Sequence, residues 1–342
     1  MRQTDLRQLT IFVIVTATTA CDNVGWGGVA LSIQPPSERS GEAAAEAAAD
    51  TTVLPEGPIL YAAAIDDETA TLRPLVELRG DSLHALEPTG DRVLFNTRFI
   101  DREYRPGTEF VLLSHGTRVG TVAVQEVLAA DGSFCPQVPA ARGVAELTAS
   151  AMRRPPRSAP PRPTSFLALR KEPLSPRPHG AYRDAQIDGA MRAATFEIAL
   201  AELRARGATS PPDWIRARAD VTPLPTTGTA RAFAATYLFR DNLALEPPPS
   251  EGYSLFFVAE EGQAGFTPTY VWFRSYTRAD KAAPRFYDHF DLDGDGTDEI
   301  LLEVFGAERA WFAILDRSGG RWTLVYEDAC GAALATDQSP RE

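Results

Sequence analysis

The chain has 342 residues, of which 44% are hydrophobic, and a formal net charge of −12 at pH 7. This length suffices for one large domain or for two of ordinary size, each with a buried core. The acidic balance argues against nucleic acid as a partner, because it offers no excess of positive charge to a phosphate backbone.

Residues 1–20 predict an export signal. Arg2 and Arg7 precede a short apolar run from 9 to 15, and small residues follow up to Cys21. The apolar run is far shorter than the roughly 18 residues that a membrane-spanning helix needs. Such a segment is typical of a signal peptide that is removed from the mature protein.

The end of this signal, Thr-Thr-Ala-Cys at 18–21, resembles a bacterial lipobox. In that motif the cysteine is acylated and becomes the mature N-terminus. The resemblance implies a lipid such as palmitate on Cys21, which would attach the protein to a membrane of the bacterial cell envelope, at its periplasmic face or outer surface. An ordinary secretory signal that is cut nearby is the alternative.

Residues 21–57 predict a tether between the lipidated cysteine and the folded part. The segment from 34 to 57 is rich in Ala, Glu, Ser and Pro and has no apolar face to bury. A composition of this kind stays disordered, so we expect the tether to be a flexible connection between the lipid and the folded part, without functional residues of its own.

Residues 58–150 predict an N-terminal β domain, a small barrel or sandwich. Short apolar segments bounded by turn residues are typical of strands, and we expect strands at 75–78, 92–95, 109–113 and 118–124. The last two form a predicted hairpin, with a turn at 114–117 in which Gly116 supplies a positive φ. His115 in this turn could be a base or a metal ligand. No Asp or Cys stands at a recognisable spacing from it, which favours a turn role.

Residues 151–180 predict an extended linker rich in proline and arginine. Proline at this density blocks helices and inner strands. The apolar residues 166–169 interrupt the pattern and could form one short strand that returns to the N-terminal domain.

Residues 181–335 predict a C-terminal α+β domain. A helix begins at Asp184 and ends before Gly207, and Asp213 begins a shorter one. Period-two patterns then return, at 233–239, 253–258, 269–276, 300–305, 310–315 and 321–326. These strands predict an antiparallel meander with one face covered by the first helix.

The stretch 291–299, Asp-Leu-Asp-Gly-Asp-Gly-Thr-Asp-Glu, predicts a Ca²⁺ site. Closely spaced carboxylates repel one another unless a cation lies among them, and Ca²⁺ prefers oxygen ligands. The predicted ligands are the side chains of four acidic residues and one backbone carbonyl, namely Asp291, Asp293, Asp295, Glu299 and the carbonyl of Thr297. An acidic turn without an ion is the alternative.

This loop is not an EF-hand. The twelfth position, where an EF-hand has its bidentate Glu, is Leu302, and the residues that follow the loop alternate at period two. The form Asp-x-Asp-x-Asp-Gly-x-x-Glu followed by a strand resembles the calcium loops of FG-GAP and VCBS-type β repeats. Those repeats form propeller blades, but this chain contains one copy of the loop, so the resemblance supports the ion site rather than a propeller.

Three cysteines occur in the chain. If Cys21 is acylated, Cys135 and Cys330 remain as a pair in an oxidising compartment. A disulfide would join the N-terminal domain to the end of the C-terminal one, and two buried thiols are the alternative.

Motifs of known catalytic classes are absent from the sequence, so we assign no catalytic residue. There is no Gly-x-Ser-x-Gly, His-Glu-x-x-His or phosphate-binding loop, and the four histidines are scattered. His289 beside the acidic loop is expected to pack or to form hydrogen bonds, since imidazole is a poor ligand for hard cations. The aromatic stripe Tyr270, Trp272 and Tyr276 could stack on a sugar, although core packing is the favoured interpretation.

Two functional hypotheses follow. The favoured one is a lipid-anchored envelope protein whose calcium-stabilised β domain binds a protein or glycan or has a structural role. The alternative is an envelope hydrolase whose acidic loop holds a catalytic ion, which requires a cleft with perturbed titratable groups beside the loop.

Overall fold

The computed structural model describes residues 51–148, 164–171, 186–224 and 231–336. The predicted signal, Cys21, the first part of the predicted tether up to residue 50, and Asp184 lie outside the described residues, as does most of the predicted linker. The last part of the predicted tether, 51–57, is described, and it corrects the prediction: Leu54 packs against the barrel core, and the backbone N–H groups of Glu56 and Gly57 donate to Glu77. The described part is mainly β, with a barrel followed by antiparallel sheets and few helices, so the predicted fold class is confirmed.

The N-terminal part is a six-stranded antiparallel barrel. Its strands are β1 (Ile59–Asp66), β2 (Thr69–Arg79), β4 (Glu109–Ser114), β5 (Thr117–Leu128), β6 (Ala140–Leu147) and β7 (Thr164–Arg170). They follow the order β1-β7-β4-β5-β6-β2, and pairing between β1 and β2 closes the barrel, while β3 (Ser82–Ala85) extends from β2. Closure leaves no free edge among the six strands.

β7 comes from the predicted linker. It pairs with β1 on one side and with β4 on the other, so the predicted return of residues 166–169 to the N-terminal domain is confirmed. Phe166 and Ala168 belong to the barrel core, whereas Leu167 and Leu169 belong to a second core outside it. A strand that is apolar on both faces must be covered on both.

Helix α1 (Arg92–Glu103) corrects the sequence analysis, which expected a strand at 92–95. Asp91 begins this helix, since its Oδ1 accepts hydrogen bonds from the backbone N–H groups of Val93 and Leu94 at 2.8 and 3.0 Å. Phe95 and Phe99 are one helical turn apart and both pack into the barrel core. A run of four residues is too short to separate period two from period 3.6.

The C-terminal part contains two antiparallel sheets of four strands. The first has the order β11-β10-β9-β8 and the second β12-β13-β14-β15. The bounds are β8 (Arg218–Leu224), β9 (Ala232–Phe239), β10 (Gly252–Gly262), β11 (Gly265–Tyr276), β12 (Ala283–Phe290), β13 (Glu299–Phe305), β14 (Ala310–Ser318) and β15 (Arg321–Glu327). Each sheet is a meander of consecutive strands. β8 and β12, which lie at the ends of the two sheets, were not predicted from the sequence.

Three helices accompany these sheets, α2 (Gly189–Ala205), α3 (Trp214–Ala217) and α4 (Ala329–Thr336). The predicted start of the first helix at Asp184 is wrong, because Asp188 caps α2, with its Oδ1 2.8 Å from the backbone nitrogen of Met191. The predicted end of the helix before Gly207 is confirmed, because Gly207 follows the helix with a positive φ of 62°. The short helix after Asp213 is also confirmed, since that side chain caps α3.

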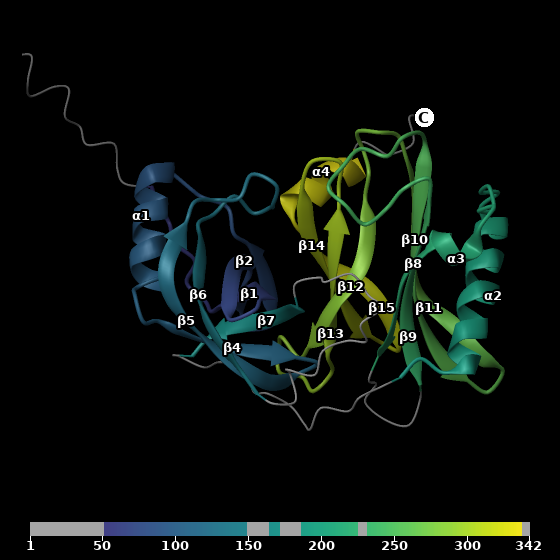
Figure 1. The fold of residues 1–342 in the computed structure, drawn as a ribbon, viewed down its shortest axis with the longest axis horizontal. Coiled ribbons are helices and arrows are strands. Elements are labelled where there is room, and N and C mark those ends of the chain that lie inside the picture. The colour runs from purple at the N-terminus through teal and green to yellow at the C-terminus, as the bar shows by residue number, and fades with distance from the viewer. Residues whose placement is uncertain (1–50, 149–163, 172–185, 225–230, 337–342) are drawn as a thin grey trace, which may run out of the picture. The chain divides into compact units, whose positions relative to one another are not determined.

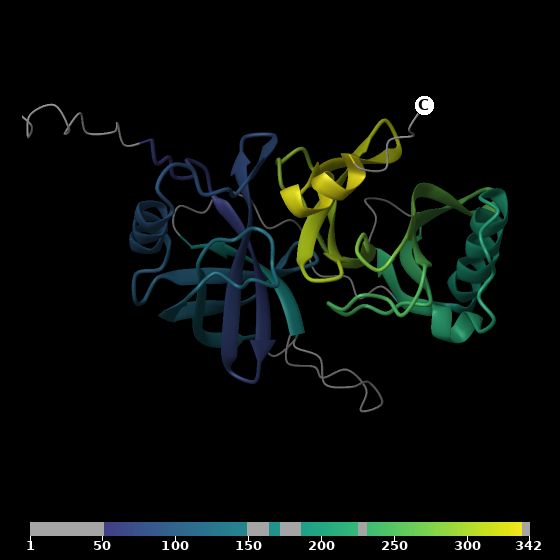
Figure 2. The same cartoon turned by 90° about the horizontal axis from the view of Figure 1, so that it is seen from above.

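The two sheets and the helices form successive layers (Figure 1). Helix α2 covers one face of β8–β11, and residues such as Met191 and Ile198 pack there against Phe257. The opposite face of that sheet packs on β12–β15, with Phe256 and Leu302 in the shared core. In Figure 2 as well as in Figure 1, α2 lies on the side of its sheet away from β12–β15.

The remaining face of β12–β15 packs on the outside of the barrel. This core includes Leu301, Phe312 and Ile314 from the sheet, together with Val111 and Leu167 from barrel strands. Adjacent residues Leu301 and Leu302 therefore point into different cores, as period two requires. The β12–β15 sheet is thus buried on both faces, which places the loop that joins β12 to β13 beside the barrel.

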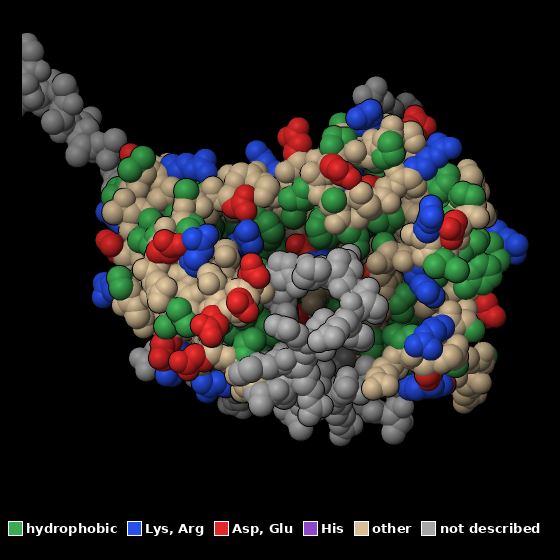
Figure 3. All heavy atoms as spheres, in the orientation of Figure 1, with side chains coloured by type: hydrophobic (Ala, Val, Ile, Leu, Met, Phe, Trp, Pro, Cys, Tyr) green, Lys and Arg blue, Asp and Glu red, His purple; other side chains and the backbone are tan. Residues whose placement is uncertain are grey.

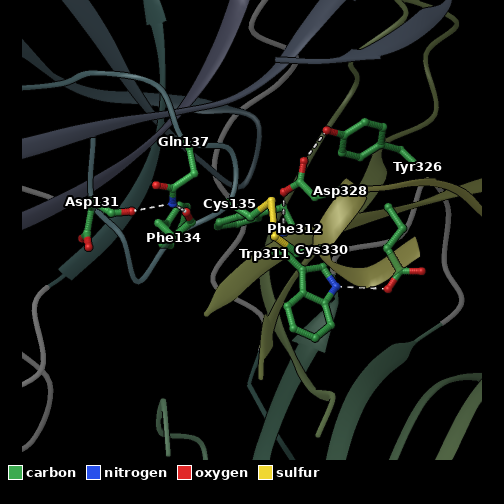
Figure 4. The surroundings of a disulfide bond; sticks show 10 residues. Asp131, Phe134, Cys135, Gln137, Trp311, Phe312, Tyr326, Asp328 and Cys330 are labelled. Atoms are coloured by element: carbon green, nitrogen blue, oxygen red, sulfur yellow. Dashed lines mark hydrogen bonds between the residues drawn. A yellow bond between two sulfur atoms is a disulfide. The ribbon is translucent and has the colours of Figure 1, made fainter. Parts of the chain in front are cut away.

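Cys135 and Cys330 lie at disulfide-bonding distance, with their Cα atoms 6.4 Å apart (Figure 4). Cys135 is in the loop between β5 and β6, and Cys330 is in the first turn of α4. Beside the bond, the backbone nitrogen of Cys135 donates to the carbonyl of Ala310 at 2.9 Å, and that of Ala310 donates to the carbonyl of Ser133 at 2.9 Å. A bond between the two cysteines would fasten a barrel loop to the end of the C-terminal sheet.

Asp328 occupies the same region, and its Oδ2 accepts a hydrogen bond from the backbone N–H of Phe312 at 2.9 Å. The hydroxyl of Tyr326 donates to its other oxygen (Figure 4). Burial raises the pKa of Asp328 to about 7. The carboxyl group thus sits in a dry, hydrogen-bonded environment next to the disulfide.

Candidate metal centre

The loop 291–299 is the turn of the hairpin formed by β12 and β13. Gly294 and Gly296 have positive φ values of 85° and 90°. Side chains with a Cβ rarely adopt this conformation, so glycine is the residue that lets the loop reverse here. Glu299 is the first residue of β13, which confirms the prediction of a loop that leads into a strand.

Three of the five predicted ligands converge in this loop. Carboxylate oxygens of Asp291, Asp293 and Glu299 lie within 4.8 Å of one another. Asp291 is 2% exposed and Glu299 is 4% exposed. Asp295 lies outside the converging set, and its Oδ1 accepts a hydrogen bond from the backbone N–H of Thr297 at 2.6 Å.

Backbone N–H groups of the loop orient the two buried carboxylates. The two oxygens of Asp291 accept hydrogen bonds from Gly294 at 2.7 Å and from Gly296 at 3.1 Å. Oε2 of Glu299 accepts one from Leu292 at 2.6 Å. These bonds hold the carboxyl groups of the first and last acids of the motif in place.

The electrostatics of the loop favour a cation. Burial, together with the negative charges of Asp293 and Asp291, raises the pKa of Glu299 to about 8, against the hydrogen bond from Leu292. The pKa of Asp293 is also raised, by burial and then by nearby carboxylates. A buried group of like charges is costly without a counter-charge. A divalent cation would supply that charge, and carboxylate oxygens are the ligands that Ca²⁺ and Mg²⁺ prefer.

A pocket of about 310 Å³ adjoins the loop. The β2–β3 turn lines one side of it, and the C-terminal sheet lines the other. Asp293 and Glu299 take part in the lining, together with Asp81 and Asp316. The loop therefore lies beside an acidic pocket, which the alternative hypothesis of a hydrolase requires.

A second cluster involves both histidines that the sequence analysis discussed. The predicted turn role of His115 is confirmed, because it lies between β4 and β5. Its Nδ1 is also 3.5 Å from Oδ1 of Asp288, and potential ligand atoms of His115, Asp288 and His289 lie within 4.8 Å of one another. The expected hydrogen-bonding role of His289 is confirmed by its Nδ1, 2.6 Å from Oδ2 of Asp298. Sequence analysis missed this cluster, since 173 residues separate His115 from Asp288.

The aromatic stripe of β11 is part of the core. Trp272 is 7% exposed and Tyr276 is 4% exposed, and Tyr270 packs against the core between the two sheets. Buried rings cannot stack on a sugar, so the favoured prediction of core packing is confirmed.

The charged side chains on the face shown in Figure 3 are mixed in sign, with acidic and basic groups interspersed. Within the described ranges, no helix is long and apolar enough to span a membrane. Comparison of the chain with protein-family models, with curated proteins and with solved structures gives no match. The argument for function therefore rests on the residues of the site.

Proposed function

We propose that this protein is a lipid-anchored protein of the bacterial cell envelope whose C-terminal sheets bind Ca²⁺ at the loop 291–299. The observation that carries the proposal is the convergence of the oxygens of Asp291, Asp293 and Glu299 in the β12–β13 hairpin. An ion there would join the beginning and the end of the loop, and so hold the two strands together.

The cysteines support the envelope location. Disulfides persist in oxidising compartments such as the bacterial periplasm and the cell surface, and are rare in the cytosol. The pair Cys135 and Cys330 lies at bonding distance, and the lipobox-like residues 18–21 precede it in the chain. We propose that the protein acts there as a binding or structural module for a protein or glycan ligand.

Calcium should stabilise the protein. If the ion binds only the folded state, free Ca²⁺ at about 100 times its dissociation constant adds about 2.7 kcal/mol to the free energy of unfolding. The melting temperature of the purified protein should therefore rise with calcium and fall again with chelator, as measured by differential scanning calorimetry. Absence of both a shift and a binding heat at millimolar calcium would reduce the loop to an acidic turn.

Asp293→Asn is the variant that tests the ligand assignment. It preserves the shape of the side chain but removes one charge, so it should weaken calcium binding. It should also stabilise the ion-free protein by reducing the repulsion among the carboxylates. The order of melting temperatures of variant and wild type should thus reverse when chelator replaces calcium. Asp101→Asn, on the surface of α1, is the matched control and should show no reversal.

Cys21→Ser tests the anchor. A single acylated residue provides the proposed attachment, so the variant should leave the membrane fraction or accumulate as an unprocessed precursor. Immunoblots of membrane and soluble fractions, together with metabolic labelling by a palmitate analogue, measure both effects. Retention of the variant in membranes after a high-salt wash would contradict the lipid anchor.

The acidic pocket favours a second function, that of an envelope hydrolase with a catalytic ion. A cation held by Asp293 and Glu299 would face the pocket and could polarise a substrate oxygen or a water molecule. Calcium-dependent hydrolysis of an envelope glycan or ester, lost in Asp293→Asn, would support this function. A calcium-stabilised protein that retains its ligand in a cell-wall pull-down without turnover would favour the binding module.

A further inference from the structure

His115, Asp288 and His289 form a cluster that is separate from the acidic loop and that the calcium proposal does not use. His115 belongs to the β4–β5 turn of the barrel, whereas the other two residues belong to β12. One potential ligand atom from each of the three lies within 4.8 Å of the other two. Two imidazoles and a carboxylate are a different chemistry from the all-oxygen set of the loop, and they suit transition metals rather than calcium.

The cluster lies at the end of a sheet, because β12 is the first strand in its sheet order. The register of β12 against β13 shifts between Phe286 and Asp288, a β-bulge directly before the two cluster residues of this strand. Bulges redirect side chains and occur often beside functional sites. The turn that carries His115 approaches this strand, and its backbone N–H donates to Oδ1 of Asp288 at 2.9 Å.

His289 provides the observation that points to a ligand. It is 4% exposed, and its Nδ1 lies 2.6 Å from Oδ2 of Asp298. A hydrogen bond from Nδ1 to this carboxylate leaves Nε2 as the ring nitrogen that can offer a lone pair to a metal. Within the described part of the chain, this buried Nε2 has no hydrogen-bond partner. Carboxylate, histidine and metal in this order are the usual arrangement around a protein-bound zinc ion.

We infer that His115, Asp288 and His289 bind a divalent transition metal of the zinc class, with Asp298 as the residue that orients His289. Three protein ligands leave a fourth position of a tetrahedral ion for water or for a ligand. His115 is the outermost of the three, since its side chain is 26% exposed, against 3% for Asp288.

The geometry is close to that of a bound ion. Zinc bonds of about 2.0–2.1 Å place tetrahedral ligand atoms about 3.3–3.4 Å apart. The atoms here lie within 4.8 Å of one another, so they need to approach by at most about 1.5 Å.

Zinc binding by the full-length protein tests the inference. The protein is treated with chelator, dialysed, and titrated with Zn²⁺ by calorimetry in the presence of millimolar Ca²⁺, which occupies the acidic loop. We expect one equivalent of zinc to bind, and Co²⁺ in its place to give the visible absorption bands of nitrogen ligation. Failure of the wild-type protein to bind zinc under these conditions would overturn the inference.

Three variants separate the site from adventitious binding. His115 has a φ of 48°, a conformation that Asn tolerates well, so His115→Asn removes the ligand and preserves the turn. We expect it to lose the bound equivalent while its melting temperature without zinc equals that of the wild type. Asp298→Asn should bind zinc about 10–100-fold more weakly, because it no longer orients His289. His84→Gln, at an exposed position on β3, is the matched control and should bind as the wild type does.

The outcomes are distinguishable from those of the calcium proposal. Asp293→Asn should change the calcium response and retain zinc, whereas His115→Asn should lose zinc and retain the calcium response. Undiminished zinc binding by His115→Asn, or an equal loss in His84→Gln, would show binding elsewhere on the protein and overturn the assignment.

Discussion

Replacement of Lys281 by Met is expected to lower the free energy of unfolding by about 3–5 kcal/mol. The ammonium group of Lys281 is completely buried, and it lies 2.8 Å from Oδ1 of Asp241, which is 1% exposed. Methionine fills a similar volume but leaves the Asp241 carboxylate buried without its counter-charge. A buried ion that loses its partner is far more costly than a surface ion, because water cannot replace the partner.

The same substitution removes three further hydrogen bonds. The ammonium group donates to the carbonyls of Asn242, Ala244 and Glu246 at 3.0, 2.8 and 3.2 Å. These residues belong to the connection between β9 and β10, so Lys281 fixes a segment that has no strand or helix of its own. Loss of these bonds adds the cost of unsatisfied carbonyls to that of the unpaired carboxylate.

The chain contains its own control for this experiment. Lys171 is the other lysine of the sequence, and it pairs with Glu109 at the surface, where both side chains are more than 40% exposed. Lys171→Met should cost about 0–1 kcal/mol. The double variant Lys281→Met with Asp241→Asn should recover part of the loss, because it removes both charges. Urea denaturation curves measure all three differences, and a loss in Lys281→Met no larger than that in Lys171→Met would contradict the prediction.

The sequence predicts the C-terminal strands whose alternation is regular and misses β8 and β12, just as it misses β1, β3 and β6 in the N-terminal part. β8 contains Pro223, and β12 contains Pro284 and the charged Arg285. Each is the terminal strand in the order of its sheet, a position where proline is tolerated because one side of the strand needs no partner. Prolines and charged residues interrupt the apolar alternation on which strand prediction depends. These two strands are therefore not recognised from the sequence.

The burial of β12–β15 on both faces is also beyond sequence analysis. The consecutive apolar residues Ile300, Leu301 and Leu302 indicate a strand covered on both sides, and they do lie in two different cores. The pattern does not reveal which partners cover them. Those partners are the barrel strands and the β8–β11 sheet, and both are distant in the sequence.

The two candidate metal clusters also differ in how far the sequence predicts them. The acidic loop is contiguous, so its spacing alone predicts Asp291, Asp293 and Glu299 as neighbours around an ion. The cluster of His115 with Asp288 and His289 joins the β4–β5 turn to strand β12, and His115 and Asp288 are 173 residues apart. Only the packing of the barrel against the C-terminal sheet brings these residues together. The spacing of residues in the sequence does not predict that packing.

Removal of the disulfide is expected to lower the free energy of unfolding by about 2–5 kcal/mol. Cys135 and Cys330 are separated by 195 residues. In the unfolded state, a bond between them therefore restricts most of the chain that forms the described structure. By the chain-entropy model a loop of this length is worth about 5 kcal/mol at most. The double variant Cys135→Ser with Cys330→Ser should therefore melt at a clearly lower temperature than the wild type.

Two measurements verify that the loss comes from the bond. Reducing agent should lower the melting temperature of the wild type toward that of the double variant and should leave the double variant unchanged. Cys21→Ser is the matched control, and its melting temperature should respond to reducing agent as the wild type does. Digestion without reduction should yield one peptide that contains both Cys135 and Cys330. Quantitative alkylation of both thiols in the native, unreduced protein would contradict the prediction. In that case, the backbone hydrogen bonds of Cys135 and Ser133 to Ala310 would hold the barrel loop against the C-terminal sheet.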